Sequence, residues 1–357
     1  MVDFFKSRRD EIEAYLRDLF VRKQLEFARI NGLGRDLCNR LLDFAVHGKM
    51  IRGGLVSLGY ALFRGDPEEE QQQQLAAAGA AMELFQSALL VHDDIMDRDT
   101  TRRGLASLYF QYAELADRQG VNESYHLGES LGICAGDVAF FLAFEILAGL
   151  KIDPDTYRRI LALTAKEIGY VGVAQMQDIY NGATTHRVTD ADILRLYLYK
   201  TGRYTFSLPL ILGGILAGRP EADIELLEKL GESIGIVFQI RDDELGLFGN
   251  RSETGKPVGS DIREGKKTLY FGYLNELAAD EDRLKLSRIF GSQDLSEEDI
   301  RFVQDLTEKL GIRDTVRKLV DTEFKQANEL LTRLKDTVPP FSQALQELLD
   351  YTLVRTK

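Results

Sequence analysis

Residues 89–97 decide how this chain folds and what it binds: they read Leu-Leu-Val-His-Asp-Asp-Ile-Met-Asp, an apolar helical run that ends in three carboxylates. At about 100° per residue, Asp93 and Asp97 lie on one helix face, one turn apart. Like charges at this spacing repel each other, and hard divalent cations such as Mg²⁺ prefer oxygen ligands of this kind. Taken alone, the motif predicts either a magnesium site or an ordinary solvated helix end.

A second acidic helix end favours the magnesium site. Residues 239–244 read Gln-Ile-Arg-Asp-Asp-Glu and follow another apolar segment at 234–238. Two such helix ends could face one another across a cavity and share metal ions. A cavity of this kind suits a ligand with a polyphosphate head and a hydrocarbon tail. The predicted metal ligands are Asp93, Asp94, Asp97, Asp242 and Asp243.

The composition describes a globular chain that can bury a substantial core: 357 residues, of which 44% are hydrophobic and 29% charged. The formal net charge of −12 argues against a nucleic-acid or anionic-membrane surface. Cys38 and Cys134 stand far apart, as reduced thiols of a cytoplasmic protein would. The first 16 residues lack an apolar signal core. Because no run approaches the ~18 apolar residues of a spanning helix, we expect no stable membrane insertion.

The spacing of apolar residues and breaks predicts an all-α protein. Seven prolines and few β-branched alternations indicate helix nearly throughout. We find no repeat beyond the two acidic motifs and no linker that would mark a domain boundary. We therefore predict one helical bundle over residues 1–357, with a central apolar cavity and the site at one end of the helices. The predicted breaks are at 31–34, 65–67, 120–122, 153–154, 218–220 and 339–340.

Basic residues lie near these motifs in the sequence. Lys49 and Arg52 flank a glycine-rich break, which suits a diphosphate but also a helix C-cap. Arg102 and Arg103 follow the first acidic motif and could clamp phosphate oxygens or form surface salt bridges. The glycine-rich segment 249–268 could be a lid that brings lysine to a diphosphate, or an ordinary surface loop.

Together these motifs resemble the trans-isoprenyl diphosphate synthases, the family that makes farnesyl, geranylgeranyl and longer polyprenyl diphosphates. The resemblance spans residues 45–270, in the order and spacing of that family. The matching positions are Lys49, Arg52, Asp93, Asp94, Asp97, Arg102, Arg103, Gln175, Asp178, Lys200, Thr201, Gln239, Asp242, Asp243, Lys256, Asp261 and Lys266.

Three positions depart from the family pattern. Gly246 replaces the third aspartate of the second motif. We expect activity to survive this replacement, while its effect on metal affinity is left open. Met50 stands where the basic motif usually has arginine, and Gly53 where it usually has proline. Lys49 and Arg52 remain, so we expect the second diphosphate site to be intact.

The resemblance implies a homodimeric, all-helical prenyltransferase of isoprenoid biosynthesis. About three Mg²⁺ ions, held by Asp93, Asp97 and Asp242, would bind the allylic diphosphate and stabilise the charge that builds as it leaves. Thr201 and Gln239 could place oxygen dipoles near the cation, and the departing diphosphate is the expected proton acceptor. The implied ligands of the allylic diphosphate are Arg102, Lys200, Lys256 and Lys266. Those of isopentenyl diphosphate are Lys49, Arg52, Gln86 and Arg103.

Product length should depend on the tunnel below the first motif. Ala88 and Leu89 precede Asp93 by five and four residues, where farnesyl-producing relatives often carry bulky aromatics. The small Ala88 therefore suggests a deeper tunnel, with Phe85, or Phe140 and Phe141 opposite, as its floor. We expect a geranylgeranyl (C20) product, with C25 or longer next and C15 after that.

Two other functions compete with this prediction. A terpene cyclase would carry an Asn/Asp-Ser/Thr-Glu motif in place of Asp242 and Asp243, and would not need Lys49 and Arg52. A non-catalytic regulatory subunit would be expected to lose metal carboxylates or clamp arginines, and here Gly246 is the one such loss. The sequence therefore favours a catalytic prenyltransferase.

Overall fold

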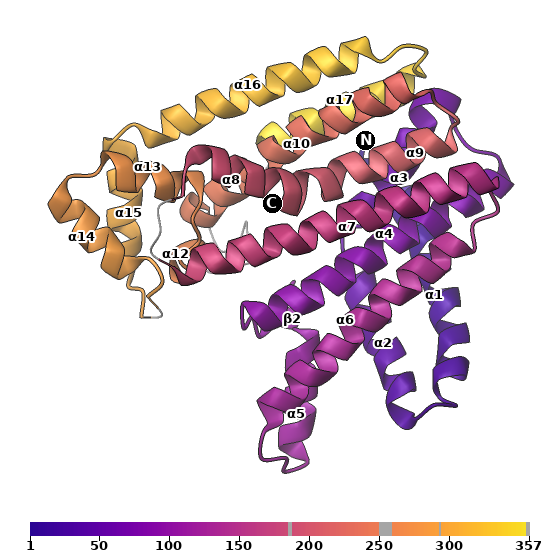
Figure 1. Ribbon diagram of the computed structural model, residues 1–357, viewed down its shortest axis with the longest axis horizontal. Helices are drawn as coiled ribbons and strands as arrows, with labels where there is room; N and C mark the ends of the chain where they lie inside the picture. Colours follow the sequence, from indigo (N-terminus) through magenta and orange to yellow (C-terminus); the bar gives the residue numbers. More distant parts are fainter. Residues whose placement is uncertain (185–187, 250–258, 293, 355–357) are drawn as a thin grey trace. The chain divides into compact units, whose positions relative to one another are not determined.

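The computed structural model describes residues 1–184, 188–249, 259–292 and 294–354, and these residues are almost wholly helical (Figure 1). A two-residue hairpin pairs Thr101 with Ala106 and Arg102 with Leu105. The elements in chain order are α1 (Val2–Phe27), α2 (Gly32–Val46), α3 (Ile51–Arg64), α4 (Glu69–Met96), β1 (Thr101–Arg102), β2 (Leu105–Ala106), α5 (Leu108–Arg118), α6 (Ser124–Ala148), α7 (Pro154–Ala183), α8 (Asp190–Tyr197), the π-helix η1 (Leu198–Ser207), α9 (Leu208–Leu216), α10 (Glu221–Phe248), α12 (Ser260–Arg263), α13 (Leu269–Leu277), α14 (Asp280–Ile289), α15 (Glu297–Lys309), α16 (Ile312–Arg333) and α17 (Pro339–Val354).

The helix ends form where the local chemistry predicts them. Asn31 caps α2 by accepting a hydrogen bond from the Gly34 N–H, at 3.1 Å. Thr189 and Asp192 form a reciprocal capping box at the start of α8. Gly65 and Gly120 turn the chain after α3 and α5 with positive φ, which glycine adopts without strain. Each predicted break therefore falls at a helix boundary.

The chain divides into two compact units. The first contains residues 1–162 and 212–219, and the second contains residues 163–211 and 220–357. The boundaries at 162/163 and 211/212 pass within α7 and α9, and the third, at 219/220, lies in the short turn between α9 and α10. The single-domain assignment stays a prediction.

In the first unit, α4 is the central helix and packs against α1, α3 and α6. Its middle, residues 76–81, consists of alanine and glycine and lets neighbouring backbones approach. A Cβ added at Gly53 would lie 3.0 Å from the carbonyl oxygen of Gly79, so α3 and α4 touch at this point. Gly53 is therefore explained by the close approach of two helices.

In the second unit, α10 has the corresponding position and packs against η1, α16 and α17. Its buried side chains Val237 and Ile240 share a core with Leu274 and Val316 from α13 and α16. This core fixes the part of α10 that carries the second acidic motif.

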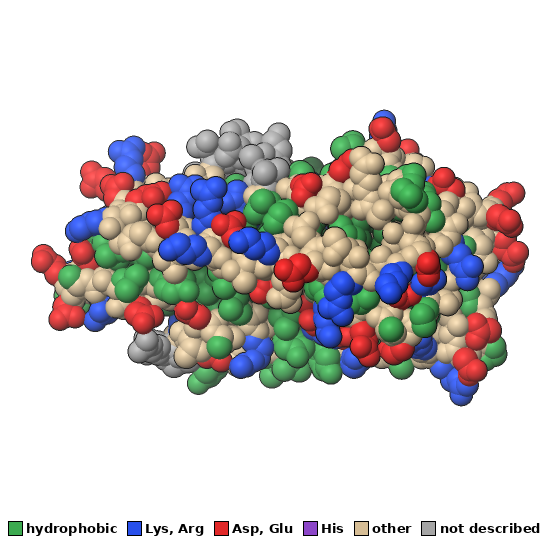
Figure 2. Space-filling view, turned by 90° about the horizontal axis from the view of Figure 1, so that it is seen from above, with side chains coloured by type: hydrophobic (Ala, Val, Ile, Leu, Met, Phe, Trp, Pro, Cys, Tyr) green, Lys and Arg blue, Asp and Glu red, His purple; other side chains and the backbone are tan. Residues whose placement is uncertain are grey.

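The surface carries charges of both signs, and acidic and basic side chains are interspersed on the face drawn in Figure 2. Two helices, α4 and α6, reach the length and apolar content of a membrane span, so the expectation that no segment would approach this limit was wrong. The apolar window of α4 is 78% buried, as expected for a core helix, and that of α6 is 44% buried.

Candidate active site

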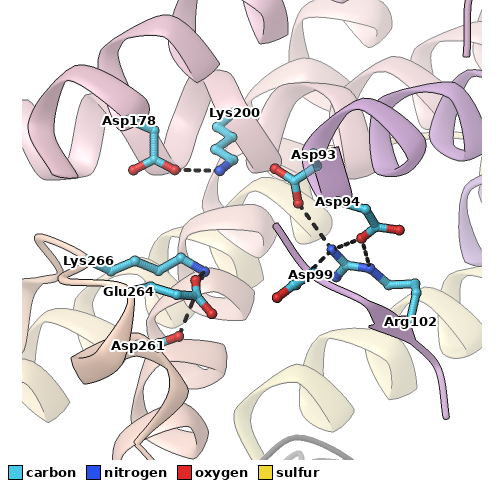
Figure 3. A network of polar contacts seen from close by, with 9 residues as sticks. All are labelled: Asp93, Asp94, Asp99, Arg102, Asp178, Lys200, Asp261, Glu264 and Lys266. Atoms are coloured by element: carbon cyan, nitrogen blue, oxygen red, sulfur yellow. Dashed lines mark hydrogen bonds and ion pairs between the residues drawn. The ribbon is translucent and has the colours of Figure 1, made fainter. Parts of the chain in front are cut away.

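The first acidic motif lies at the C-terminal end of α4, where its three carboxylates have different surroundings. Asp93 and Asp97 are half-buried, whereas Asp94 is fully buried. The Arg102 guanidinium donates a hydrogen bond from Nε to Asp94 Oδ1 at 2.6 Å. The Nη2 of Arg102 also lies 3.4 Å from Asp93 and 3.3 Å from Asp99 (Figure 3). The hairpin β1–β2 thus places Arg102 directly on the acidic motif as an ion-pair partner, and its role as a clamp on phosphate stays a prediction.

Burial dominates the electrostatics of Asp94. Desolvation raises the pKa of its carboxyl to about 7, although the charge of Arg102 opposes this shift. Its second oxygen, Oδ2, is buried and has no hydrogen-bond partner. An unpartnered buried carboxylate oxygen is unfavourable unless a cation or donor reaches it.

The basic residues of the first unit surround a buried acid that we did not single out in the sequence. Glu83 is 4% exposed, and its Oε1 accepts a hydrogen bond from the Gly53 N–H at 2.8 Å. Burial raises the pKa of Glu83, and the charges of Arg52 and Arg103 oppose that shift. Glu83 therefore binds the N-terminus of α3 at the point where the basic motif begins. Its position in an otherwise apolar stretch was the available signal, because a buried charge needs partners.

A glycine and a strained residue lie beside these basic residues. Met50, the N-cap of α3, is buried and has φ of 53°, which is uncommon for a bulky residue. A Cβ added at Gly48 would lie 2.9 Å from Nη1 of Arg103. The same Nη1 donates to the Phe44 carbonyl at 3.2 Å. Gly48 therefore leaves the space that the Arg103 guanidinium occupies, while Lys49 is exposed and Gln86 is half-buried on α4.

The aromatic residues of the first unit form a cluster below the motif. Phe85 is fully buried, with its ring centroid 6.2 Å from Phe140 and 4.9 Å from Phe144. Ala88 is buried and Leu89 half-buried on the same helix. Phe141 is 73% exposed, so its ring points away from this cluster. Phe140 is thus the predicted ring that meets Phe85, and Phe144 is a further member of the cluster.

The second acidic motif repeats the division between an accessible and a buried carboxylate. Asp242 is exposed and Asp243 is buried on α10. Tyr197 donates its hydroxyl hydrogen to Asp243 Oδ2, and Gln239 Nε2 donates to Asp243 Oδ1 at 2.9 Å. Thr201 in turn donates to Gln239 Oε1 at 2.9 Å. Burial raises the pKa of Asp243 well above its usual range, with the charge of Asp261 adding to the shift.

This hydrogen-bonded chain connects four elements of the second unit. The Leu269 N–H donates to the Tyr197 hydroxyl oxygen at 3.1 Å, which extends the chain from η1 through α10 and α8 to α13. Tyr197 was not among the predicted site residues. A lone tyrosine in an apolar helix gives no sequence signal for its hydrogen-bond partner, because that partner is 46 positions away.

Lys200 lies on η1 and forms an ion pair with Asp178 of α7 (Figure 3). Both side chains are half-buried, and Gln175 is half-buried one turn earlier on α7. The structure thus brings together Lys200 and Asp178, which the sequence had assigned to two separate polar motifs.

Position 246, where the family's third aspartate is missing, lies against the segment that follows. A Cβ added at Gly246 would meet the carboxylate of Asp261, with Cγ at 2.9 Å. Lys266 Nζ lies 3.8 Å from Asp261 and 2.6 Å from Glu264 (Figure 3). Asp261 therefore occupies the space beside Gly246. Lys256 lies outside the described residues.

The sequence profile of the polyprenyl synthetase family matches residues 35–307. The chain belongs to this family. It is 30% identical to the geranylgeranyl diphosphate synthase of Sulfolobus acidocaldarius over 88% of this chain and 89% of that protein. It is also 30% identical to the geranylfarnesyl diphosphate synthase of Aeropyrum pernix over 78% of this chain and 82% of that protein.

The fold agrees with that membership. A crystal structure of geranylgeranyl pyrophosphate synthase from Corynebacterium glutamicum, complexed with isoprenyl diphosphate and magnesium, superposes with a TM-score of 0.88. The two chains are 27% identical and cover 98% of each other. The predicted all-α fold and the family resemblance are therefore confirmed, and this polyprenyl synthetase is a prenyltransferase.

The donor set of the polyprenyl synthetase fits magnesium. Its acidic motifs offer carboxylate oxygens, the ligands that Mg²⁺ prefers, and Oδ2 of Asp94 lacks any other partner. Among the described side chains, no group of three or more acids, histidines or cysteines is already gathered as a metal site. The carboxylates of the two acidic motifs are the side chains that would hold the ion.

Proposed function

We propose that this polyprenyl synthetase condenses isopentenyl diphosphate head to tail with an allylic diphosphate and makes geranylgeranyl diphosphate (C20). One observation carries the proposal: the first unit holds both an acidic motif with its own arginine and, around Glu83 on the same helix α4, a group of basic residues that includes Arg52 and Arg103. A metal-bound allylic diphosphate suits the first, and a diphosphate bound without metal suits the second.

The acidic motifs of both units would serve the allylic diphosphate. Asp93, Asp97 and Asp242, supported by Asp94 and Asp243, would hold about three magnesium ions, which supply charge stabilisation to the departing diphosphate when bound. The cationic side chains proposed to share this diphosphate are Arg102, Lys200, Lys256 and Lys266. Thr201 and Gln239 would direct oxygen dipoles toward the carbocation.

The basic residues around Glu83 would hold isopentenyl diphosphate. Lys49, Arg52 and Arg103 supply positive charge, and Gln86 lies on the helix that carries both sites. Arginine can bind phosphate oxygens through two parallel N–H donors. Such a contact would fix the orientation of the diphosphate and therefore that of the isopentenyl double bond. The departing diphosphate is the proposed acceptor of the proton lost after condensation.

We propose that the aromatic cluster sets product length. Ala88 leaves space on α4 below the motif, and Phe85 with Phe140 would form the floor. One similar protein is a geranylgeranyl diphosphate synthase and another is a geranylfarnesyl diphosphate synthase. A product longer than C20 is therefore the alternative.

The test is the product made from dimethylallyl or farnesyl diphosphate, isopentenyl diphosphate and Mg²⁺, identified by mass spectrometry. Wild type should give C20 and Ala88→Phe should give C15, because a ring at position 88 blocks the tunnel. Phe140→Ala should lengthen the product, whereas Phe141→Ala should not, since its ring points away from α4. No product from any primer would overturn the proposed reaction. An unchanged Ala88→Phe product would overturn the proposed tunnel alone.

We infer a cytoplasmic homodimer without stable membrane insertion or nucleic-acid partners. Support comes from the apolar side chains that α6 exposes, among them Tyr125, Ile133 and Phe141, which suit a subunit contact. Light scattering after gel filtration would report the mass. A monomer in solution would contradict the inferred assembly.

A further inference from the structure

Arg203 of η1 gathers three carboxylates in the second unit. Its Nε and Nη2 donate to the two oxygens of Glu167 on α7, at 2.9 and 2.8 Å. Its Nη2 also donates to Glu228 at 2.5 Å, and its Nη1 donates to Glu232, both on α10. Arg203 and Glu167 are buried, at 9% and 2% exposure. One guanidinium therefore ties η1 to two neighbouring helices.

Stability alone does not account for this cluster. Three acids around one arginine leave excess negative charge, and Lys166, 3.5 Å from Glu167, is itself half exposed to solvent. Burial raises the pKa of Glu232, with Arg203 opposing the shift. Replacing buried ion pairs by apolar side chains is often neutral or stabilising, so such groups are better explained by the geometry they specify.

The geometry at stake is that of η1. Its ten residues form a π-helix, a rare conformation that is frequent at functional sites. Gly202 of η1 and Gly235 of α10 approach so closely that a Cβ added at Gly235 would lie 3.0 Å from the Gly202 carbonyl carbon. With no side chain between the two backbones at this point, η1 is held on α10 by the ring contact of Phe206 with Phe238 and by polar contacts.

The polar contacts of η1 form two sets, and each set reaches both α7 and α10. Lys200 pairs with Asp178 of α7, and Thr201 donates to Gln239 of α10. Arg203 repeats both connections, to α7 through Glu167 and to α10 through Glu228. If Lys200 binds a diphosphate, it must give up much of its interaction with Asp178, and the Arg203 connection then holds η1 on α7.

We propose that Arg203 is a positioning residue that holds η1 in place while Lys200 exchanges Asp178 for the allylic diphosphate. This inference rests on the proposed function of Lys200. It predicts that Arg203 acts through Lys200, so the two residues are energetically coupled during ligand binding.

The test is a double-mutant cycle on ligand affinity, measured by titration calorimetry with an allylic thiolodiphosphate in Mg²⁺. Arg203→Lys keeps the charge but loses the two-donor contact of the guanidinium with Glu167, and should weaken binding about tenfold. In a Lys200→Ala background the same change should weaken binding less than about twofold, because the residue it positions is gone. Glu167→Gln should weaken binding in the same way as Arg203→Lys. It replaces Arg203→Lys in the test if the Arg203→Lys protein does not fold.

A matched control and the activity separate the possible failures. Arg40 is a half-buried arginine of the first unit that donates to Asp36 and Gln111, and Arg40→Lys should leave the affinity unchanged. Equal losses from Arg203→Lys in both backgrounds, with an active wild type, would overturn the positioning role and leave the reaction standing. A wild type that neither binds the analogue nor turns over any primer would overturn the proposed function, and this inference with it.

Discussion

Single carboxylates in this polyprenyl synthetase have different roles according to their depth. In both acidic motifs the first aspartate reaches solvent, while the second, Asp94 or Asp243, is buried and hydrogen-bonded to Arg102 or Tyr197. A buried charge loses hydration and must be held by fixed donors. The second aspartate therefore fixes the local structure from which the first one reaches a ligand.

Glu83 offers a prediction whose sign distinguishes two explanations. If it positions Arg52 and the start of α3, Glu83→Gln should weaken binding of isopentenyl diphosphate about tenfold, since a charge-assisted hydrogen bond is lost. If it only cancels positive charge, the same variant should bind more tightly. Calorimetric titration with isopentenyl diphosphate measures the difference. Glu129→Gln, at a half-buried acid of the same unit, is the matched control and should change nothing.

At the scale of elements, the sequence predicted several helix boundaries because glycine and proline act locally, but it did not predict the turns between α13, α14, α15 and α16. The breaks at 65–67 and 218–220 coincide with the ends of α3 and α9. The π-helix η1 was not predicted, because ten residues of apolar pattern do not separate a π-helical from an α-helical period. Its conformation depends on tertiary contacts such as Gly202 against Gly235.

Restoring the family residue at position 246 should harm this protein. Gly246→Asp would place Cβ against the Asp261 carboxylate and add a like charge, so we expect a loss of about 1–3 kcal/mol in unfolding free energy, as for overpacking elsewhere. Urea unfolding measures this loss. Gly246→Ala separates the steric part from the charge, and Gly246→Asp with Asp261→Gly should recover most of the stability. A single Gly246→Asp variant that is as stable as wild type would show that Asp261 moves aside at no cost.

At the scale of the whole molecule, the acidic and basic motifs could be recognised in the sequence by residue type and spacing, and their roles stay predictions. The sequence could not identify the partners that hold them, because Glu83, Tyr197 and the glutamates around Arg203 are distant in sequence from the groups they contact. Motif residues are recognisable by their type and spacing, whereas supporting residues are ordinary until packing brings them together. Each unit therefore carries a recognisable acidic motif on a support that the sequence did not predict.

The proposal that the two acidic motifs serve one diphosphate predicts strong coupling between them. An allylic thiolodiphosphate with Mg²⁺ should raise the thermal unfolding midpoint of wild type, and chelation of the metal should abolish the rise. Asp93→Asn and Asp242→Asn should each remove most of it, because a shared ligand needs both carboxylates. Since little stabilisation then remains, the double variant should lose hardly more than either single one. Asp155→Asn, at an exposed acid, should keep the full rise. Losses that simply add would instead mean that the two motifs bind separate ligands, and the chemistry would have to be assigned to one motif alone.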